Sequence, residues 1–113
     1  MSCIFCRIIA KEIPARVIRE DAEWLAFEDV QPQAPHHVLL VPRRHIGGLP
    51  DCGTPEQSLL GALLSGAAEV ARARGIEERG YRVVINSGVD GGQSVAHLHV
   101  HLLAGRPMKW PPG

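Results

Sequence analysis

Three histidines alternate along the segment His97-Leu98-His99-Val100-His101. Residues two apart on a β-strand point to the same face of the sheet, so the segment predicts a row of imidazoles on one exposed strand face. The aliphatic side chains between them then face the core. Because a strand rises about 3.3 Å per residue, the outer two backbones lie about 13 Å apart, which is too far for one tetrahedral zinc ion to bind all three easily. The spacing favours a division of roles among the three rings.

The chemistry that suits such a row is nucleophilic attack on phosphorus. Imidazole has an ordinary pKa of about 6.5, so a neutral nitrogen is available at physiological pH. Attack gives an N-phosphoryl intermediate and splits one difficult displacement into two easier ones. We predict that the central His99 attacks, and that His97 and His101 orient it and bind substrate. The alternative is a solvent-exposed strand face that happens to carry histidines.

A glycine-rich loop, Asn86 to Gln93, leads into the histidine segment. Its last part, Gly91-Gly92-Gln93-Ser94, is able to aim backbone N–H groups at an anion, and Ser94 adds a hydroxyl. A Gly-Gly pair alone is a weak signal. Placed directly before the histidine row, it predicts a phosphate site.

Cys3 and Cys6 have the spacing of a zinc-ligand pair, which makes half of a tetrahedral site. Histidines from elsewhere would complete it, and His45 and His97 are candidates. The alternative is that both cysteines are small apolar residues of the first helix, and the spacing alone favours neither reading.

Two further positions are candidates near the expected sheet. His36 and His37 precede an apolar strand and would face opposite ways on it, so at most one joins the site. Asp29 lies just past a strand end, where it either binds a ligand or caps a turn.

The composition limits the class of partner. Twelve basic and twelve acidic side chains cancel, which argues against bulk binding to nucleic acid or a membrane surface. Aromatic residues make up only 4% of the chain, which argues against base stacking along a surface. No apolar run suits a signal peptide or a membrane span, and three cysteines do not suggest a disulfide framework. We therefore expect a cytoplasmic protein.

Periodicity and turn residues predict an α+β fold with a mainly antiparallel sheet, in a single domain over residues 1–113. The longest helix is expected to start at an N-cap Thr54, with Pro55 in its first turn and Gln57 completing a capping box, and to stop at Gly75. The other expected elements are a short helix at 4–9, strands at 17–18, 24–27, 38–41, 81–85 and 98–103, a loop at 31–35 and an irregular tail at 107–113.

Five segments together resemble the histidine-triad family, and are most similar to its nucleotide-binding phosphoramidase branch. They are Cys3-Ile4-Phe5-Cys6, Phe27-Glu28-Asp29, Gln33-Ala34-Pro35-His36-His37, Asp90-Gly91-Gly92-Gln93-Ser94 and the histidine segment itself. The terminal Trp110-Pro111-Pro112-Gly113 also resembles that branch. The resemblance implies a HIT-like fold, a five-stranded antiparallel sheet with two helices, paired as a homodimer.

The resemblance also implies an activity and a set of roles. The activity is hydrolysis of adenosine or guanosine phosphoramidates through a nucleotidyl-histidine, which releases an amine and a nucleoside monophosphate. His99 matches the nucleophile, while His97, His101 and His37 match supporting histidines and Ser94 the hydroxyl near the leaving group. The positions that match nucleotide-binding residues are Ile4, Phe5, Ile8, Phe27, Asp29, Leu39, Asn86, Gly92, Gln93, Ser94, His99 and His101, together with Trp110 of the tail.

The presence of both amino-terminal cysteines resembles zinc-binding relatives, and it implies a structural zinc ion held by Cys3, Cys6, His45 and His97, with no organic cofactor. The expected partners are a purine nucleotide, such as a derivative of AMP or GMP, and a second copy of the chain. Two other functions stay open: a dinucleoside polyphosphate hydrolase, and a nucleotide-binding scaffold with little turnover. The terminal Trp-Pro-Pro-Gly and the position of His37 favour the phosphoramidase over the first alternative, and an intact His99 argues against the second.

Overall fold

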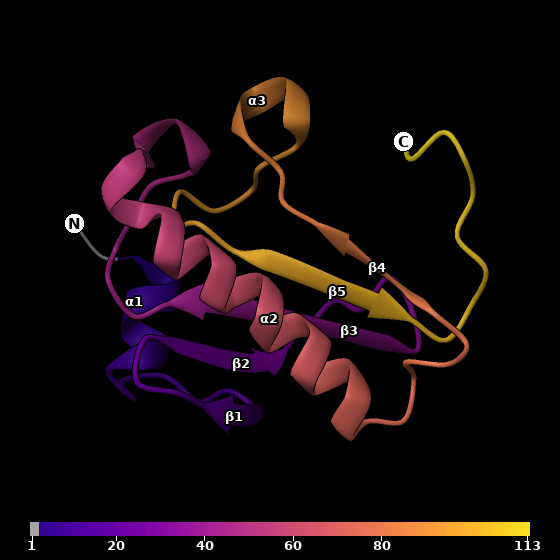
Figure 1. The fold of residues 1–113 in the computed structure, drawn as a ribbon. Helices are drawn as coiled ribbons and strands as arrows, with labels where there is room; N and C mark the ends of the chain where they lie inside the picture. The colour runs from indigo at the N-terminus through magenta and orange to yellow at the C-terminus, as the bar shows by residue number, and fades with distance from the viewer. Residues whose placement is uncertain (1–2) are drawn as a thin grey trace.

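The fold was analysed in a computed structural model that describes residues 3–113. Short helices flank a single sheet, and one long helix crosses it (Figure 1). In chain order the elements are α1 (Ile4–Ile9), β1 (Val17–Glu20), β2 (Trp24–Glu28), β3 (His36–Pro42), the 3₁₀ turns η1 (Leu49–Asp51) and η2 (Thr54–Glu56), α2 (Gln57–Ala73), β4 (Tyr81–Val84), α3 (Gly88–Gly91) and β5 (Val100–Ala104). Within residues 3–113 no helix is both long and apolar enough to cross a membrane.

The five strands form one sheet in the order β1-β2-β3-β5-β4, and every neighbouring pair is antiparallel. This confirms the predicted α+β fold with an antiparallel sheet. The two predicted helices correspond to α1 and α2. The single turn α3 lies inside the segment that was expected to be an irregular loop.

The two faces of the sheet carry different apolar clusters. Helix α2 packs over one face, where Leu98, Val100 and Leu102 are buried as predicted. The opposite face holds a smaller cluster that includes Phe5 of α1 and Leu39 of β3. The larger cluster therefore lies between the long helix and the sheet, and the smaller cluster lies on the face that carries α1.

The histidine segment differs from the prediction in two respects. Strand β5 begins at Val100, so His97 and His99 precede it and only His101 lies within it. The Leu98 N–H donates to the carbonyl of Ile46, and the ladder with β3 begins at Val100, which pairs with Leu40. The predicted exposed row is also wrong, since His97 and His99 are 0% and 4% exposed.

The start of α2 also differs from the prediction. Residues Thr54–Glu56 form a 3₁₀ turn, and the Gly53 N–H donates to Glu56 Oε1 at 2.8 Å, which is the half of a capping box that a glycine at the N-cap allows. Thr54 is therefore not the N-cap. The predicted stop at Gly75 agrees with the structure, because Gly75 follows the C-cap and has a left-handed φ of 71°.

A pair of glycines on α2 tests how tightly the helix packs on the sheet. A Cβ built on Gly66 would lie 2.7 Å from Trp24 Cζ2 and 3.2 Å from Leu40 Cδ2, whereas one built on Gly61 meets nothing within 4 Å. We expect Gly66→Ala to lower the free energy of unfolding by about 1–3 kcal/mol through overpacking. The matched Gly61→Ala should raise it by about 0.5–1 kcal/mol through helix propensity. Urea denaturation measures both, and a stabilising Gly66→Ala would contradict the packing described.

Candidate active site and metal centre

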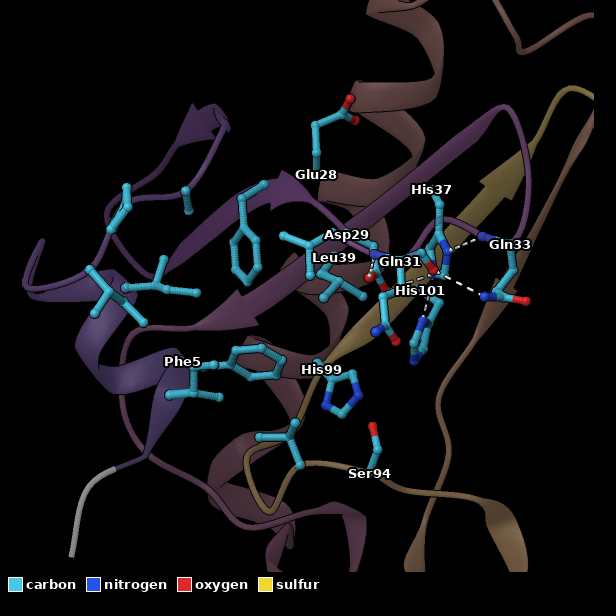
Figure 2. A pocket seen from close by; sticks show the side chains of 18 residues that line it. Phe5, Glu28, Asp29, Gln31, Gln33, His37, Leu39, Ser94, His99 and His101 are labelled. Atoms are coloured by element: carbon cyan, nitrogen blue, oxygen red, sulfur yellow. Dashed lines mark hydrogen bonds and ion pairs between the residues drawn. The ribbon is translucent and has the colours of Figure 1, made fainter.

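A pocket of about 410 Å³ opens on the face of the sheet that carries α1 (Figure 2). It brings together most of the residues predicted to bind nucleotide. Those that line it are Ile4, Phe5, Ile8, Phe27, Asp29, Leu39, Ser94, His99 and His101, and His37, predicted as a supporting histidine, lines it too. The structure does not place Asn86, Gly92, Gln93 or Trp110 in its lining.

The sheet register explains how distant residues meet in this pocket. Leu39 of β3 lies opposite Phe27 of β2 on one side and opposite His101 of β5 on the other. Side chains directly opposite on neighbouring antiparallel strands share a face. Phe27, Leu39 and His101 therefore lie side by side on one face of the sheet, so an apolar surface borders an imidazole. Phe5 of α1 packs over this face, with its ring edge-on to Phe27.

The position of His99 determines which of its nitrogens carries the hydrogen. Its Nδ1 lies 2.7 Å from the carbonyl oxygen of His97, and a carbonyl only accepts, so Nδ1 carries the hydrogen. The lone pair is then on Nε2. Phe5 lies edge-on to the ring, with 5.2 Å between centroids. His99 is therefore a buried imidazole whose Nε2 faces away from this hydrogen bond, beside the pocket.

His37 and His101 have a complementary arrangement. The backbone N–H of Gln33 donates to His37 Nδ1 at 3.0 Å, so the hydrogen of His37 is on Nε2. That Nε2 donates to His101 Nδ1 at 2.9 Å and lies 3.3 Å from Asp29 Oδ2. The hydrogen of His101 is consequently on its own Nε2. His99 thus offers a lone pair and His101 offers an N–H, which is what attack on a phosphoryl group requires.

Burial keeps these rings neutral. Burial is the largest cause of a shift that lowers the pKa of His101 to about 4; the neighbouring His99 and His37 contribute to this shift, and Asp29 opposes it. Burial also lowers the pKa of His37, against the attraction of Asp29 and Glu28. At neutral pH the rings are therefore uncharged, and the hydrogen positions inferred from their hydrogen bonds hold.

Asp29, His37 and His101 also place ligand atoms within 4.8 Å of one another. A metal at this cluster would need the lone pair of His37 Nε2. That nitrogen carries a hydrogen, because Gln33 already occupies the lone pair of Nδ1. The cluster therefore favours a chain of hydrogen bonds over a metal site.

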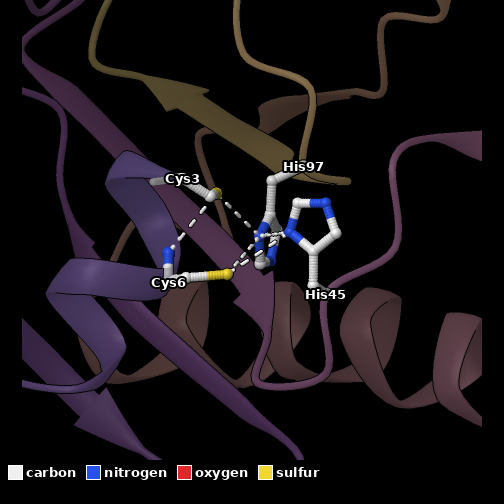
Figure 3. A group of neighbouring side chains, drawn as sticks. All are labelled: Cys3, Cys6, His45 and His97. Carbon is white, nitrogen blue, oxygen red and sulfur yellow. Dashed lines mark hydrogen bonds between the residues drawn. The ribbon is translucent and has the colours of Figure 1, made fainter. Parts of the chain in front are cut away.

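A second cluster lies beyond the His99 end of the pocket and joins Cys3, Cys6, His45 and His97 (Figure 3). His97 Nδ1 lies 3.3 Å from Cys3 Sγ, 3.6 Å from Cys6 Sγ and 3.1 Å from His45 Nδ1. Cys6 Sγ is 3.3 Å from His45 Nδ1. Bonds of about 2.0–2.3 Å from zinc to nitrogen and sulfur give tetrahedral edges of about 3.3–3.8 Å. The distances between the nitrogen and sulfur atoms of the cluster are close to these expected edge lengths.

The hydrogen bonds of His97 agree with the same ligand set. Its Nε2 donates to the carbonyl of Pro42 at 2.9 Å, which leaves the lone pair of Nδ1 facing the two thiols. Burial lowers the pKa of His97, so the neutral ligand form is present at physiological pH. On α1, Cys3 is the N-cap and accepts the Cys6 N–H at 3.4 Å, so one helical turn brings both sulfurs to one side. The donors fit zinc.

The glycine-rich loop differs from the prediction. The N–H groups of Gly92 and Gln93 donate to the carbonyls of Val89 and Gly88 and so close the α3 turn, where an anion was expected. The Gln93 side chain donates to the carbonyls of Gly47 at 2.7 Å and Val95 at 3.0 Å. Gln93 therefore braces the loop, and of this segment Ser94 reaches the pocket.

Sequence reasoning missed the part played by the loop between β2 and β3. The Gln31 N–H donates to Asp29 Oδ1 at 2.8 Å, and the Gln33 N–H fixes the His37 tautomer. The signal available was the position of this Pro-containing loop between Asp29 and the paired histidines. Other lining residues that were not predicted are Ile13, Pro14, Ala15, Glu28, Val30 and Val95.

Two remaining predictions have plain outcomes. His36 lies on the opposite face from His37, where its Nδ1 accepts from the Arg74 guanidinium at 3.1 Å, so only one of the pair joins the site. Trp110 is 83% exposed, and the tail is held at Lys109, whose carbonyl accepts from Arg82. The tryptophan therefore does not fold back onto its own domain.

The sequence pattern that defines the HIT domain matches residues 10–108. The chain belongs to the HIT domain family. A crystal structure of a HIT family hydrolase from Legionella pneumophila Philadelphia 1 superposes with a TM-score of 0.97 and 48% sequence identity, covering 99% of this chain and 100% of the other. This confirms both the family resemblance and the HIT-like fold.

Two other relatives of this HIT protein carry informative names. A 14 kDa zinc-binding protein of Zea mays is 53% identical over 112 residues, which cover 97% of this chain and 87% of the relative. A histidine triad nucleotide-binding protein from Candida albicans has a TM-score of 0.84 and 33% identity, over 97% of this chain and 83% of that one. One relative is thus named for binding zinc and another for binding nucleotides.

Proposed function

We propose that this HIT protein is a hydrolase of purine nucleoside phosphoramidates that acts through a nucleotidyl-His99 intermediate. The observation that carries the proposal is the pair of opposite tautomers in the pocket, with a lone pair on His99 Nε2 and an N–H on His101 Nε2. The hydrolase and nucleotide-binding relatives support the same class of chemistry. The whole chain is proposed to work as one HIT domain.

The pocket suits a nucleotide laid along it. The base would lie in the apolar part between Phe5, Phe27 and Leu39, which offers no donor to distinguish adenine from guanine. Asp29, held by the Gln31 N–H, would accept from the ribose hydroxyls. The phosphate would then lie between Ser94, His99 and His101.

The proposed reaction has two steps. In the first, the lone pair of His99 Nε2 forms a bond to phosphorus and the P–N bond of the substrate breaks. The leaving nitrogen keeps the electron pair and takes a proton that the Ser94 hydroxyl passes from solvent. The ring then carries positive charge, which the carbonyl of His97 stabilises through Nδ1–H.

In the second step a water oxygen attacks phosphorus and the P–Nε2 pair returns to His99. The water proton goes to solvent and replaces the one used in the first step. Throughout, the His101 N–H stabilises charge on a phosphoryl oxygen, and His37 holds His101 in the tautomer that donates.

We also propose that Cys3, Cys6, His45 and His97 hold a zinc ion with a structural role. Four protein ligands leave no open position for a substrate or water, so zinc there would supply rigidity and no Lewis-acid chemistry. The spacing of the four donors and the zinc-binding relative support the assignment.

A homodimer is the third part of the proposal. The exposed Trp110 lies in a tail that leaves the domain beside β4, an edge strand of the sheet (Figure 1). A large apolar ring left in water and an unpaired strand edge both favour a partner surface. In a symmetric dimer the tail would reach the partner's pocket near the leaving group.

The nucleophile is tested by His99→Ala. We expect turnover of an adenosine 5′-phosphoramidate to fall by about 10⁴-fold or more, because losing a covalent nucleophile removes the intermediate. AMP binding should stay within an order of magnitude of wild type. The matched control is His36→Ala on the opposite face, which should keep full activity. Mass spectrometry should detect the nucleotidyl adduct in wild type only.

Residual activity of His99→Ala above about one per cent, in a preparation free of wild type, would show that another residue attacks phosphorus. Faster cleavage of a dinucleoside polyphosphate than of the phosphoramidate would favour the alternative hydrolase. Binding of AMP without turnover of either would favour the scaffold.

The zinc proposal predicts close to one zinc per chain in the purified protein. Cys3→Ser with Cys6→Ser should lose it, because both thiolate ligands are removed, whereas Cys52→Ser should keep it because Cys52 lies outside the cluster. Atomic absorption measures the metal in each. Removal of zinc should lower the melting temperature more than kcat. Equal zinc in wild type and the double variant would disprove the site.

The tail predicts a change in selectivity without loss of the nucleophile. Trp110→Ala, and truncation after Arg106, should change relative rates among substrates with different amine leaving groups while the adduct at His99 still forms. Sedimentation should give about twice the chain mass at micromolar concentration. A fully active monomer would disprove the shared site, and an intact Trp110→Ala dimer with unchanged selectivity would disprove the part played by the tail.

A further inference from the structure

Helix α1 borders both the metal centre and the nucleotide pocket. Cys3 and Cys6 present their sulfurs to His45 and His97, while Ile4, Phe5 and Ile8 line the pocket. The helix has only six residues and lies near the amino-terminal end of the chain. Such a short helix is marginal by itself, so its position depends on what it contacts.

Phe5 is the residue of α1 that links the two sites. It is the one buried residue of the helix and lies between the two cysteines in sequence. Its ring is edge-on to His97, with 5.7 Å between centroids, and edge-on to His99, with 5.2 Å between centroids. Figure 2 shows the same ring facing His99 across the pocket. An interaction that holds Cys3 and Cys6 in place therefore also holds Phe5, which lines the pocket.

Two further connections run through the histidine ligands. His97 directs Nδ1 to the metal cluster, and its carbonyl accepts the Nδ1–H of His99. His45 lies two residues before Gly47, whose carbonyl accepts from the Gln93 side chain next to Ser94. Each of the three segments that supply metal ligands thus also supports the pocket.

From these contacts we propose that the metal centre and the nucleotide pocket are energetically coupled through α1, with Phe5 as the positioning residue. The inference rests on the proposed function, and it adds a property that neither site has alone. Metal binding orders α1 before the nucleotide binds. The free energy of nucleotide binding then no longer includes the entropic cost of ordering the α1 residues that line the pocket. By thermodynamic linkage, the nucleotide must tighten metal binding by the same factor.

The coupling is measured with two probes, zinc alone and AMP. Isothermal titration of AMP into zinc-loaded and chelator-treated protein gives one factor, and competition for zinc against a chromophoric chelator, with and without saturating AMP, gives the other. We expect AMP to bind at least about five-fold more tightly to the loaded protein, and the two factors to agree.

Phe5→Leu and Phe27→Leu form a matched pair. Both remove a phenyl ring from the pocket, and both should weaken AMP binding. Only Phe5 lies on α1 with its ring against His97. We expect the zinc-loaded Phe5→Leu variant to show a reduced effect of AMP on zinc affinity, while Phe27→Leu keeps the wild-type factor. This comparison stays decisive even where the protein without zinc fails to fold.

Equal AMP affinity in the loaded and stripped folded proteins would overturn the coupling and leave the proposed function intact. An unchanged coupling factor in Phe5→Leu would overturn the assignment to Phe5 and α1. Absence of AMP binding in every form would contradict the proposed function and the coupling together.

Discussion

Three of the polar groups of His97 connect the core, the Cys/His cluster and His99. Its Nε2 donates to the carbonyl of Pro42 at the end of β3, which fixes the ring and leaves Nδ1 facing the thiols of Cys3 and Cys6. Its backbone carbonyl accepts from His99 Nδ1, which leaves the lone pair of His99 Nε2 free. Because the residue is fully buried, each of these hydrogen bonds is made away from competing water, where leaving one unmade costs most.

The chemistry of the pocket depends on where two hydrogens lie. His99 and His101 are similar rings on neighbouring positions, yet one presents a lone pair and the other an N–H. The difference comes from backbone groups, the carbonyl of His97 and the amide of Gln33, and it reaches His101 through His37. Burial lowers the pKa of His101 to about 4, so this arrangement is not erased by protonation at neutral pH. A fixed backbone thus gives two identical side chains opposite roles.

One face of the sheet carries the larger apolar cluster, and the opposite face carries the pocket. Helix α2 covers one face, where its Leu63, Ala67 and Val70 pack against strand residues in the larger apolar cluster. Only the short α1 lies on the opposite face, beside Leu25, Phe27 and Leu39. The pocket opens on the less covered face, and the Cys/His cluster joins Cys3 and Cys6 of the α1 segment to His45 and His97.

Residue spacing together with the family resemblance predicted the fold class, the family and ten of the residues that line the pocket. Alternation places Leu98, Val100 and Leu102 in the core, and the period of two in β3 separates His36 from His37. These are local rules of strand geometry, so they can be read from spacing. The zinc-ligand spacing of Cys3 and Cys6 is equally local, but spacing alone did not choose between a metal site and apolar packing.

The folded backbone, and not the spacing of the histidines, sets which ring nitrogen of each carries a hydrogen. Spacing treated positions 97, 99 and 101 as one exposed row, whereas the chain enters β5 only at Val100 and buries the first two rings. Spacing also did not indicate that the amides of Gly92 and Gln93 close the α3 turn, or that the Gln33 amide sets the tautomer of His37. Each of these outcomes depends on a hydrogen bond or packing contact whose geometry the folded backbone sets, and no pattern of residue types encodes which backbone group a given imidazole will meet.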